Sequence, residues 1–433
     1  MDKISIFKKT IEEFGLKIPL DNICINKVLI NSKELSKDDV FIAIRGGNNF
    51  IREAAEKEAY VIYDDETKKI DYDKAFLVKD SVEFLQKFAK NWRENLNLKV
   101  IGITGSNGKT TVKDIVYQLL SIKYNGKKTE GNLNNHIGLP ISLLRAEKTD
   151  DFIVLEMGMS DLGEIDLLAN ISKPDYGIIT NIGDSHLEFL KTRENVFKAK
   201  SEIVSHIKSK LFTSYDDPYL QELDGIKVSV KSDTADYYAQ DINLSGDGTA
   251  FMLNKNTKVS TNLIGEHNIL NLLFGLALSK EFGISEEQLL NEVKNIRLTD
   301  MRFQKIESGN MIYINDAYNA SPLSMEKAIL TFSEIYNDRY KIVILGDMLE
   351  LGDKAVEFHE ELEKLLRNTK QNEILLYGPL MKSLYEKIKD LNTYHYDEKN
   401  EIKNKLKKHN IEKAAVLLKG SRGMRLEEII EGN

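Results

Sequence analysis

The chain is poor in the residues that build disulfides, zinc sites, membrane spans and long linkers. Its one cysteine, Cys24, cannot form an internal disulfide, and no Cys/His spacing typical of zinc is present. Six prolines and no low-complexity tract leave no obvious long linker. No apolar run approaches the length needed to cross a bilayer, and charge interrupts the first residues, MDKISIFKKTIEEFGLKI, every few positions. We therefore expect a soluble, cytoplasmic protein without membrane insertion.

Charge and length narrow the class further. Lys and Arg number 60 against 68 Asp and Glu, which gives a formal net charge of −8 at pH 7. Nonspecific nucleic-acid binding relies on a basic surface, so nucleic acid is not an expected partner. At 433 residues the chain is long enough for two to four domains with large cores.

Alternating strand and helix patterns predict an α/β protein of three domains. Residues 1–98 are expected to form a small α/β domain, residues 99–299 a central doubly wound parallel sheet, and residues 300–433 a Rossmann-like α/β domain. Residues 237–263 break this rhythm, and DINLSGDGTAFML predicts a hairpin in a small antiparallel appendage. The helix HNILNLLFGLALSKEFG follows, and Gly283 is expected to end it.

The segment VIGITGSNGKTTVKDIVYQLL predicts a buried strand, a turn of small residues and a helix. Such a turn aims backbone N–H groups and a helix N-terminus at one point, which favours an anion. Lys109 adds a positive charge, and Thr110 offers a hydroxyl to Mg²⁺. The pattern departs from GxxxxGK[ST], because Ile103 stands where the first glycine should be and the glycine falls at position 105. An ordinary strand-to-helix turn is the alternative, but strand, glycines, lysine and threonines together favour a triphosphate cradle.

Two further strand ends carry residues suited to metal-bound phosphates. Glu156 ends the strand FIVLE, and His186 follows YGIITNIGDS. In an open parallel sheet, ligands collect beyond the carboxyl ends of the strands. Thr110, Glu156 and His186 are therefore expected to converge on metal ions that bridge phosphates. A lone histidine is usually structural, but His186 lies beside the predicted phosphate site.

Two pairs of residues have alternative interpretations. Lys198 and Lys200 lie in the helix segment VFKAKSEI, where a solvated basic patch is the simpler reading, above all for Lys198. Asn268 and Asn271 are three residues apart on an apolar helix and share one face. Buried amides need partners, so this pair either ties the helix to a loop or meets the polar edge of a ligand. The sequence leaves both readings open.

A series of motifs resembles the Mur ligases, in the order seen in that family. They are TGSNGKTT, EGNLNNHIGLP, EMGMSDLGEI, TNIGDSHLEFL, GEHNILN, DAYNASPLSM, GDMLELG with His359, and KGSRGM. Before Lys99 the match is weaker: NSKELSKDDVFIAIRG resembles the nucleotide-sugar segment, but NNFI stands where Asp-Gly-His is usual. The phosphate turn alone marks the wider ligase family, which includes the folate polyglutamate ligases.

The resemblance implies an activity and its participants. It implies an ATP- and Mg²⁺-dependent amide ligase of peptidoglycan precursor synthesis, acting as a monomer through an acyl phosphate. GNLNN, YNASP and GDMLELG imply UDP-N-acetylmuramoyl-tripeptide and D-alanyl-D-alanine as substrates. Residues 1–98 would bind the UDP-sugar, residues 99–299 would bind ATP, and residues 300–433 would complete the ligase.

The resemblance also implies roles for individual residues. The phosphates of ATP would be held by Gly105, Ser106, Asn107, Gly108, Lys109, Thr110 and Thr111. Catalytic roles would fall to Lys109, Glu156, His186 and Lys200. Mg²⁺ would be held by Thr110, Glu156 and His186, and by Lys200 if carboxylated, as in related ligases; lysine can be carboxylated only when neutral.

Other contacts follow from the same resemblance. Further ATP contacts would come from Asn268, Asn271, Arg302, Asp316 and Asn319. Arg302 suits a γ-phosphate because its charge is fixed and its donors form a planar fork, the alternative being a surface ion pair. The substrates would be contacted by Ser32, in the UDP-sugar domain, and by Asn134, Asn135, Lys419, Ser421 and Arg422, which would face the peptides.

Two other functions compete with this interpretation. A folate polyglutamate ligase shares the phosphate turn. A nucleotide-switched binding module is the second, but GTPase switches read guanine with an Asn-Lys-x-Asp element, which is absent after Thr111.

Overall fold

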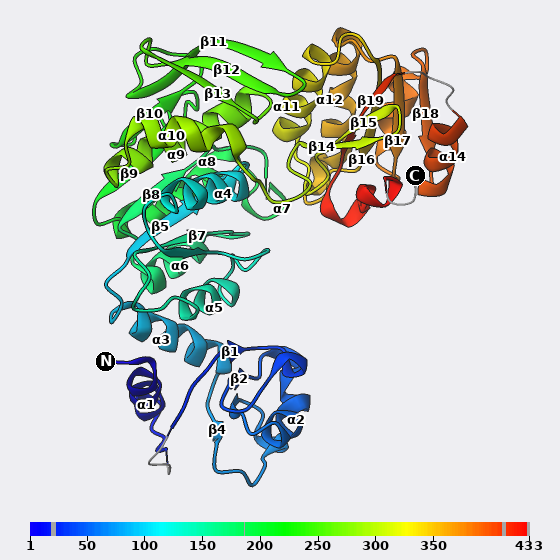
Figure 1. Ribbon diagram of the computed structural model, residues 1–433. Coiled ribbons are helices and arrows are strands. Elements are labelled where there is room, and N and C mark those ends of the chain that lie inside the picture. The colour runs from blue at the N-terminus through cyan, green and yellow to red at the C-terminus, as the bar shows by residue number, and fades with distance from the viewer. Residues whose placement is uncertain (19–22, 186, 409–412, 431–433) are drawn as a thin grey trace.

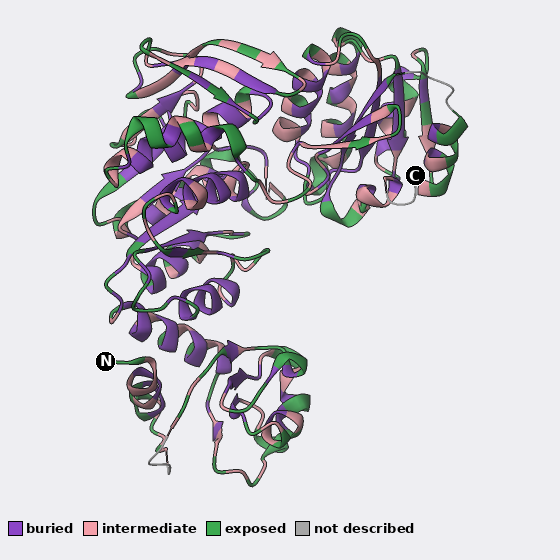
Figure 2. Cartoon of the chain, viewed as in Figure 1, coloured by how far each residue is buried: buried purple, intermediate pink, exposed green. Residues whose placement is uncertain are grey.

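The computed structural model describes residues 1–18, 23–185, 187–408 and 413–430. Three α/β units follow one another along the chain, and the C-terminal unit projects to one side of the other two, so the molecule has a concave side (Figure 1). The strands are mostly buried, and most of the exposed residues lie on helices and loops at the outside (Figure 2). The expected fold class is confirmed. Within the described ranges, no helix is long and apolar enough to cross a membrane.

The N-terminal unit is a parallel sheet that packs on the central unit through α3 (Ser81–Arg93), with further contacts from Lys3 and Val28–Leu29. Trp92 and Arg93 at the end of α3 donate to backbone carbonyls of the central unit, at Ala146 and Ser172. One apolar core therefore runs from the first sheet into the second. The other elements of this unit are α1 (Lys3–Glu13), β1 (Val28–Leu29), β2 (Val40–Ile42), α2 (Ile51–Glu56), β3 (Tyr60–Tyr63) and β4 (Ala75–Leu77).

The central sheet is doubly wound around β5 (Lys99–Thr104), which lies between β7 (Phe152–Glu156) and β8 (Tyr176–Ile179). Helices α4 (Lys109–Leu120) and α9 (Glu266–Glu281) pack against each other on one face. As expected, Gly283 follows α9 with a positive φ of 67°. The remaining parallel strands and helices are β6 (Gly126–Lys128), α5 (Gly138–Leu144), α6 (Glu164–Ser172), α7 (Leu187–Leu190), α8 (Arg193–Ser201), β9 (Lys210–Ser214), β10 (Ile226–Ser229) and α10 (Glu286–Glu292).

The expected hairpin is present, but it extends the central sheet. Strand β11 (Tyr237–Ser245) pairs in parallel with β10 and antiparallel with β12 (Gly248–Leu253), which pairs with β13 (Thr257–Thr261). The hairpin tip, residues 245–248, reaches the C-terminal unit. There Tyr336 donates its hydroxyl to the carbonyl of Gly246 at 2.9 Å, and Lys305 lies 2.9 Å from the Asp247 carboxylate.

The C-terminal unit is a parallel sheet with one antiparallel edge strand, in the order β14-β15-β19-β16-β17-β18. Helices α11 to α13 pack on one face and α14 on the other. The elements are β14 (Gln304–Ser308), β15 (Met311–Asn315), α11 (Pro322–Glu334), β16 (Tyr340–Gly346), α12 (Ala355–Asn368), β17 (Glu373–Tyr377), α13 (Met381–Ile388), β18 (Thr393–Tyr396), α14 (Lys399–Lys408) and β19 (Ala414–Lys419).

Candidate active site

The turn between β5 and α4 has the geometry of an anion cradle, and two glycines are required there. A Cβ at Gly105 would lie 1.8 Å from the Thr180 hydroxyl, and Gly105 has a φ of 145°. At Gly108, with a φ of 82°, a Cβ would lie 2.6 Å from Asn271 Oδ1. Gly108 is the N-cap of α4 and places no side chain over the helix N-terminus. The first turn of α4 therefore presents free backbone N–H groups in the direction of the turn.

The residues that follow β8 hold this turn in place, a role that was not assigned from the sequence. Thr180 donates its hydroxyl to the carbonyl of Asn107 at 2.6 Å. Asn181 accepts from the Asn107 N–H at 3.0 Å and donates to its carbonyl at 3.0 Å. Ser106 Oγ accepts from the N–H of Gly183 at 2.8 Å. These residues belong to the TNIGD stretch of the motif TNIGDSHLEFL. This stretch directly follows β8, the strand next to β5, and that position was the sequence signal for a role beside the turn.

Two lysines lie close to one another beside the turn. Lys109 folds back, and its Nζ donates to the carbonyl of Gly105 at 2.8 Å. Burial lowers the pKa of Lys109; Glu156 opposes this shift, while the charge of Arg302 adds to it. Lys200 on α8 is 1% exposed, and its pKa lies well below the ordinary value, first because it is buried and then because Lys109 is near. Lys198 on the same helix is exposed.

The expected metal ligands Thr110 and Glu156 are in contact. Thr110 donates its hydroxyl to Glu156 Oε2 at 3.0 Å, and Asn134 donates to Oε1 at 2.9 Å. A hydroxyl and a carboxylate are the oxygen donors that Mg²⁺ prefers, so this pair fits the ion. The third expected ligand, His186, lies outside the described residues. Elsewhere in the described chain, no three His, Cys, Asp or Glu side chains gather as a metal cluster.

A nucleoside-sized cavity lies between the central and C-terminal units, beside the turn that joins β5 to α4. Its volume is about 330 Å³, and it is lined by the hairpin tip, by residues 262–264, by Asn268 and by the segment around Arg302. Asn271 donates to Asn268 Oδ1 at 3.4 Å, and Asn268 donates to the carbonyl of Ile264 at 2.9 Å. Both amides share one face as expected, and Asn268 ties the helix to a loop while also lining the cavity.

Three of the unpaired buried polar atoms of the described chain belong to the turn, to the start of α9 and to Arg302. Asn107 Nδ2, Arg302 Nε and His267 Nδ1 are buried and have no hydrogen-bond partner among the described residues. Buried polar groups are normally paired, so each one left open calls for an explanation. Asn107 and Arg302 offer donors, which suits the acceptor oxygens of a phosphate.

The C-terminal unit brings Arg302 to this cavity, and three other expected residues cluster behind the lining residue Phe303, whose N–H donates to Asp316 Oδ1 at 3.1 Å. Arg302 donates to the Thr110 hydroxyl at 3.0 Å and stacks 3.9 Å above the ring of Tyr318. Lys419 is 3% exposed and bonds both Asp316 Oδ2, at 2.9 Å, and the carbonyl of Asn319, at 2.6 Å.

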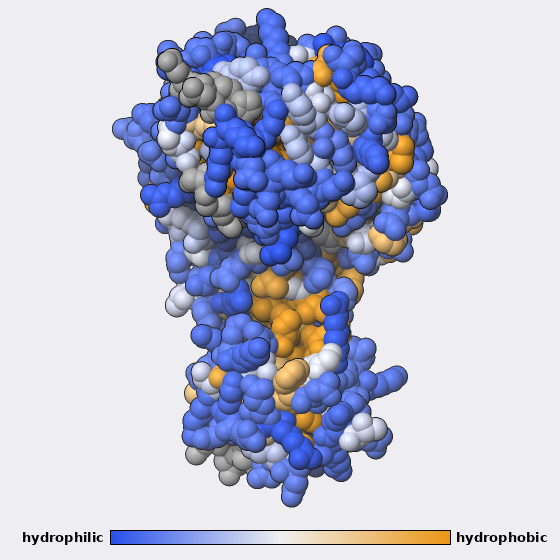
Figure 3. All heavy atoms as spheres, turned by 90° about the vertical axis from the view of Figure 1, so that its right-hand side faces the viewer, coloured by the Kyte–Doolittle hydropathy of each residue, from blue (hydrophilic) through white to orange (hydrophobic). Residues whose placement is uncertain are grey.

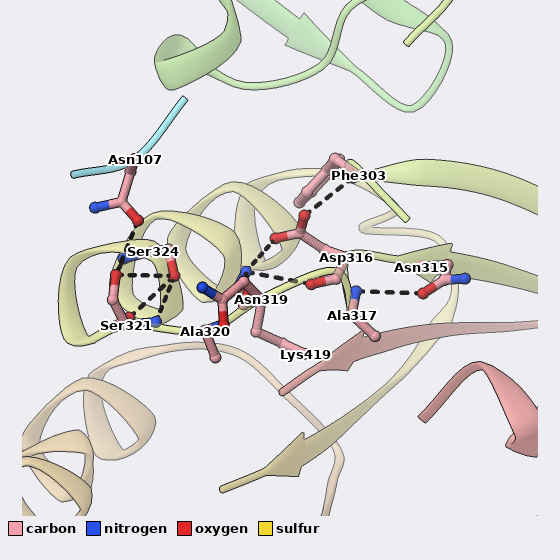
Figure 4. A network of polar contacts seen from close by, with 10 residues as sticks. All are labelled: Asn107, Phe303, Asn315, Asp316, Ala317, Asn319, Ala320, Ser321, Ser324 and Lys419. Carbon is pink, nitrogen blue, oxygen red and sulfur yellow. Dashed lines mark hydrogen bonds and ion pairs between the residues drawn. The ribbon is translucent and has the colours of Figure 1, made fainter. Parts of the chain in front are cut away.

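Figure 4 shows Lys419 with Asp316 and Asn319, together with Asn107 of the turn accepting from the Ser321 hydroxyl at the N-terminus of α11, at 2.9 Å. Side chains from the first turn of α4 and from the third unit are thus in direct contact. The surface ion pair that was the alternative for Arg302 is not what the structure shows.

The remaining expected residues lie further from this centre or serve local structure. Asn135 Oδ1 accepts from the N–H groups of Ile137 and Gly138 at the start of α5. Ser421 Oγ accepts from the N–H of Leu349 at 2.9 Å. Arg422 is paired with Glu427. Ser32 donates to Glu53 within the N-terminal unit.

A doubly wound sheet with a glycine turn, a threonine–carboxylate pair and converging lysine and arginine defines a nucleoside-phosphate-binding α/β enzyme. The Mur ligase middle domain matches residues 103–279, and the Mur ligase glutamate ligase domain matches residues 301–422. The UDP-N-acetylmuramoyl-tripeptide–D-alanyl-D-alanine ligase of Bacillus subtilis (strain 168) is 37% identical, over 94% of this chain and 93% of that protein. The chain belongs to the Mur ligase family.

Solved structures agree with this assignment. A crystal structure of MurF from Acinetobacter baumannii superposes with a TM-score of 0.89, at 26% identity, over 98% of this chain and 97% of that one. The MurF ligase of Thermotoga maritima in complex with ADP has a TM-score of 0.86 at 30% identity, over 94% of this chain and 96% of that one.

One titration is predicted from the geometry of His267. Burial lowers its pKa to about 4, from an ordinary value near 6.5. Since the unfolded chain binds a proton that the folded chain excludes, stability should fall as the pH drops from about 6.5 toward 4 and level off below. We expect this group alone to cost about 1–2 kcal/mol between pH 7 and 5. Thermal unfolding at both pH values checks this against His267→Gln, which should lose less; equal losses would contradict it.

Proposed function

We propose that this chain is an ATP-dependent amide ligase that adds D-alanyl-D-alanine to UDP-N-acetylmuramoyl-tripeptide and completes the pentapeptide precursor of peptidoglycan. The observation that carries the proposal is the convergence on one hydroxyl: Thr110 touches both Glu156 and Arg302, which come from two different units. The relative from Bacillus subtilis, whose name states these substrates, supports this reading along nearly the whole chain.

The reaction requires activation of the tripeptide carboxylate, which is a poor electrophile. The terminal carboxylate of the tripeptide attacks the γ-phosphorus of ATP, the bond to the β,γ-bridging oxygen breaks, and ADP leaves. The amine of D-alanyl-D-alanine then attacks the carbonyl of the acyl phosphate, and inorganic phosphate leaves as the amide forms. No enzyme nucleophile is needed, so the side chains act by orienting the reactants and by offsetting charge on the transferring group.

Each cluster of side chains has a part in these steps. Lys109 and the N–H groups at the start of α4 face the phosphates, and Arg302 approaches them from the other unit. Thr110 and Glu156, positioned by Asn134, would hold Mg²⁺, which offsets phosphate charge when bound. Asn268 and Asn271 would contact the nucleoside. The buried site limits hydrolysis of the acyl phosphate by water.

We place the three tasks in the three domains expected from the sequence. Residues 1–98, with Ser32, would bind the UDP-sugar, residues 99–299 would bind ATP, and residues 300–433 would bind D-alanyl-D-alanine near Lys419, Ser421 and Arg422. The muramoyl peptide would lie along the concave side, where an apolar area is visible between the N-terminal and C-terminal units (Figure 3). Asn134 and Asn135 would contact this peptide. We expect the enzyme to act as a cytoplasmic monomer without nucleic acid.

Phosphate release measured with crossed substrates tests the proposal. Release should require ATP, UDP-N-acetylmuramoyl-tripeptide and D-alanyl-D-alanine together, and ¹⁸O placed in the tripeptide carboxylate should appear in the released phosphate. Release that instead depends on folate and glutamate would identify the folate polyglutamate ligase reaction. Tight ATP binding with no ligation of any substrate would favour a nucleotide-switched module, and unlabelled phosphate would exclude the acyl phosphate.

A further inference from the structure

A row of polar side chains on α4 faces the segment that joins the central and C-terminal units. Thr110, Asp114 and Gln118 are spaced by four residues, so they lie on one face of the helix. All three bond to residues 295–302, which we call the linker. The helix that begins at the phosphate turn therefore also carries the linker along its side.

The three contacts give the direction of the linker. Gln118 donates to the carbonyl of Asn295 at 3.0 Å and accepts from the N–H of Arg297 at 2.9 Å. Asp114 Oδ2 accepts from both the N–H and the hydroxyl of Thr299, at 2.8 and 2.7 Å. Thr110 accepts from Arg302. The linker thus runs antiparallel to α4 and ends at the phosphate turn.

Asp114 is the charged and most buried member of this row. It is 1% exposed, its Oδ1 lies 2.7 Å from Lys128 Nζ, and Lys113 Nζ is 3.7 Å away. Burial would raise the pKa of Asp114, but the two lysines and the hydrogen bonds from Lys128 and Thr299 outweigh it and lower the pKa. The carboxylate is therefore ionised at neutral pH, with one oxygen held by Lys128 and the other free to accept from the linker.

The position of Thr299 constrains Arg302. They are three positions apart, which spans at most about 10 Å of backbone, so a shift of Thr299 along α4 displaces the arginine. From these contacts we infer that Asp114 is a positioning residue for phosphoryl transfer: by holding Thr299, it places the Arg302 guanidinium at Thr110. This inference rests on the proposed function, in which Arg302 acts on the phosphates of ATP.

The test compares Asp114→Ala with a variant that breaks only the ion pair. Asp114→Ala removes both bonds to Thr299 and should lower kcat about 10- to 100-fold at saturating substrates. Lys128→Met removes the ion pair and leaves the linker bonds, so it should lower the thermal midpoint with kcat within about twofold of wild type. Asp114→Asn keeps an acceptor oxygen for Thr299 and should restore most of the activity that Asp114→Ala loses.

Repeating the substitution in a second variant distinguishes a role of Asp114 in positioning Arg302 from a role in stabilising the fold. In Arg302→Ala enzyme, Asp114→Ala should add no more than about a twofold loss of kcat, because the group that it positions is already gone. If Asp114→Ala does not fold, Thr299→Val, which lacks only the hydroxyl donor, serves as the second variant, with a loss of about threefold or more that also vanishes in the Arg302→Ala background.

Two outcomes would overturn the inference: wild-type kcat in Asp114→Ala or Thr299→Val, or equal losses in both backgrounds. Full activity in Arg302→Ala alone would instead count against the proposed role of Arg302.

Discussion

Lys109→Ala should lower kcat by about 10²–10³-fold, because a donor aimed at developing charge is typically worth about 2.7–4 kcal/mol. Lys109 lies at the N-terminus of α4, partly buried, with its ammonium on the carbonyl of Gly105. When ATP binds, this ammonium can donate to phosphate oxygens in place of the Gly105 carbonyl without leaving the turn. The measurement is steady-state phosphate release with all three substrates.

A matched control for this variant lies just beyond the same helix. Lys123 follows α4 and is exposed, so Lys123→Ala removes the same charge from the unit without touching the turn. Its kcat should stay close to wild type. Near-normal kcat in Lys109→Ala would show that the turn between β5 and α4 does not hold the phosphates during transfer.

Lys200→Ala should be the second severe variant, with kcat lower by about 100-fold or more. Its amine is buried, and burial together with the nearby Lys109 holds its pKa well below the ordinary value, which favours the neutral form relative to an exposed lysine. The neutral amine can add to CO₂ and release one proton, which leaves an anionic carbamate whose oxygens would suit a second Mg²⁺. Acetate or formate should then restore part of the activity of Lys200→Ala, because a small carboxylate can enter the space left by the side chain.

The exposed Lys198 on the same helix provides the comparison. Lys198→Ala should keep wild-type kcat and gain nothing from acetate. Wild-type turnover in Lys200→Ala would remove this lysine from the mechanism, and a deep loss without rescue would leave it a role other than carrying a carboxylate.

The central strands and helices could be predicted from the sequence because their signals are local. β5, α4, β7 and α9 each have their own periodicity, and a glycine turn followed by lysine is contiguous in the chain. The hairpin was recognised, but its attachment to β10 was not, because pairing between strands depends on partners distant in sequence. Short strands such as β1 and β6 carry too few residues to show a period.

Site residues that directly follow a strand could be predicted from the sequence. Residues that hold them in place from distant parts of the chain could not. Glu156 and Thr110 were expected together and lie in contact. Thr180 and Asn181 hold the phosphate turn through bonds across more than 70 residues, which no local pattern announces. Asp114 reads as an ordinary helix residue in TTVKDIV, and only its partner Thr299, 185 residues away, reveals what it does.

The hairpin tip and the linker both border the cavity beside Arg302, so these two attachments of the C-terminal unit lie along one edge of the proposed ATP site. If the C-terminal unit rotated about this edge, the parts of the unit furthest from the edge would move most. Away from this edge, Asn107 bonds Ser321 and α7 packs against residues 352–354, so these contacts would have to part for nucleotide to enter from that side while the hairpin tip and the linker stay attached. Exchange of ADP for ATP would then require a rotation of the C-terminal unit about one edge, without full separation of that unit from the central unit.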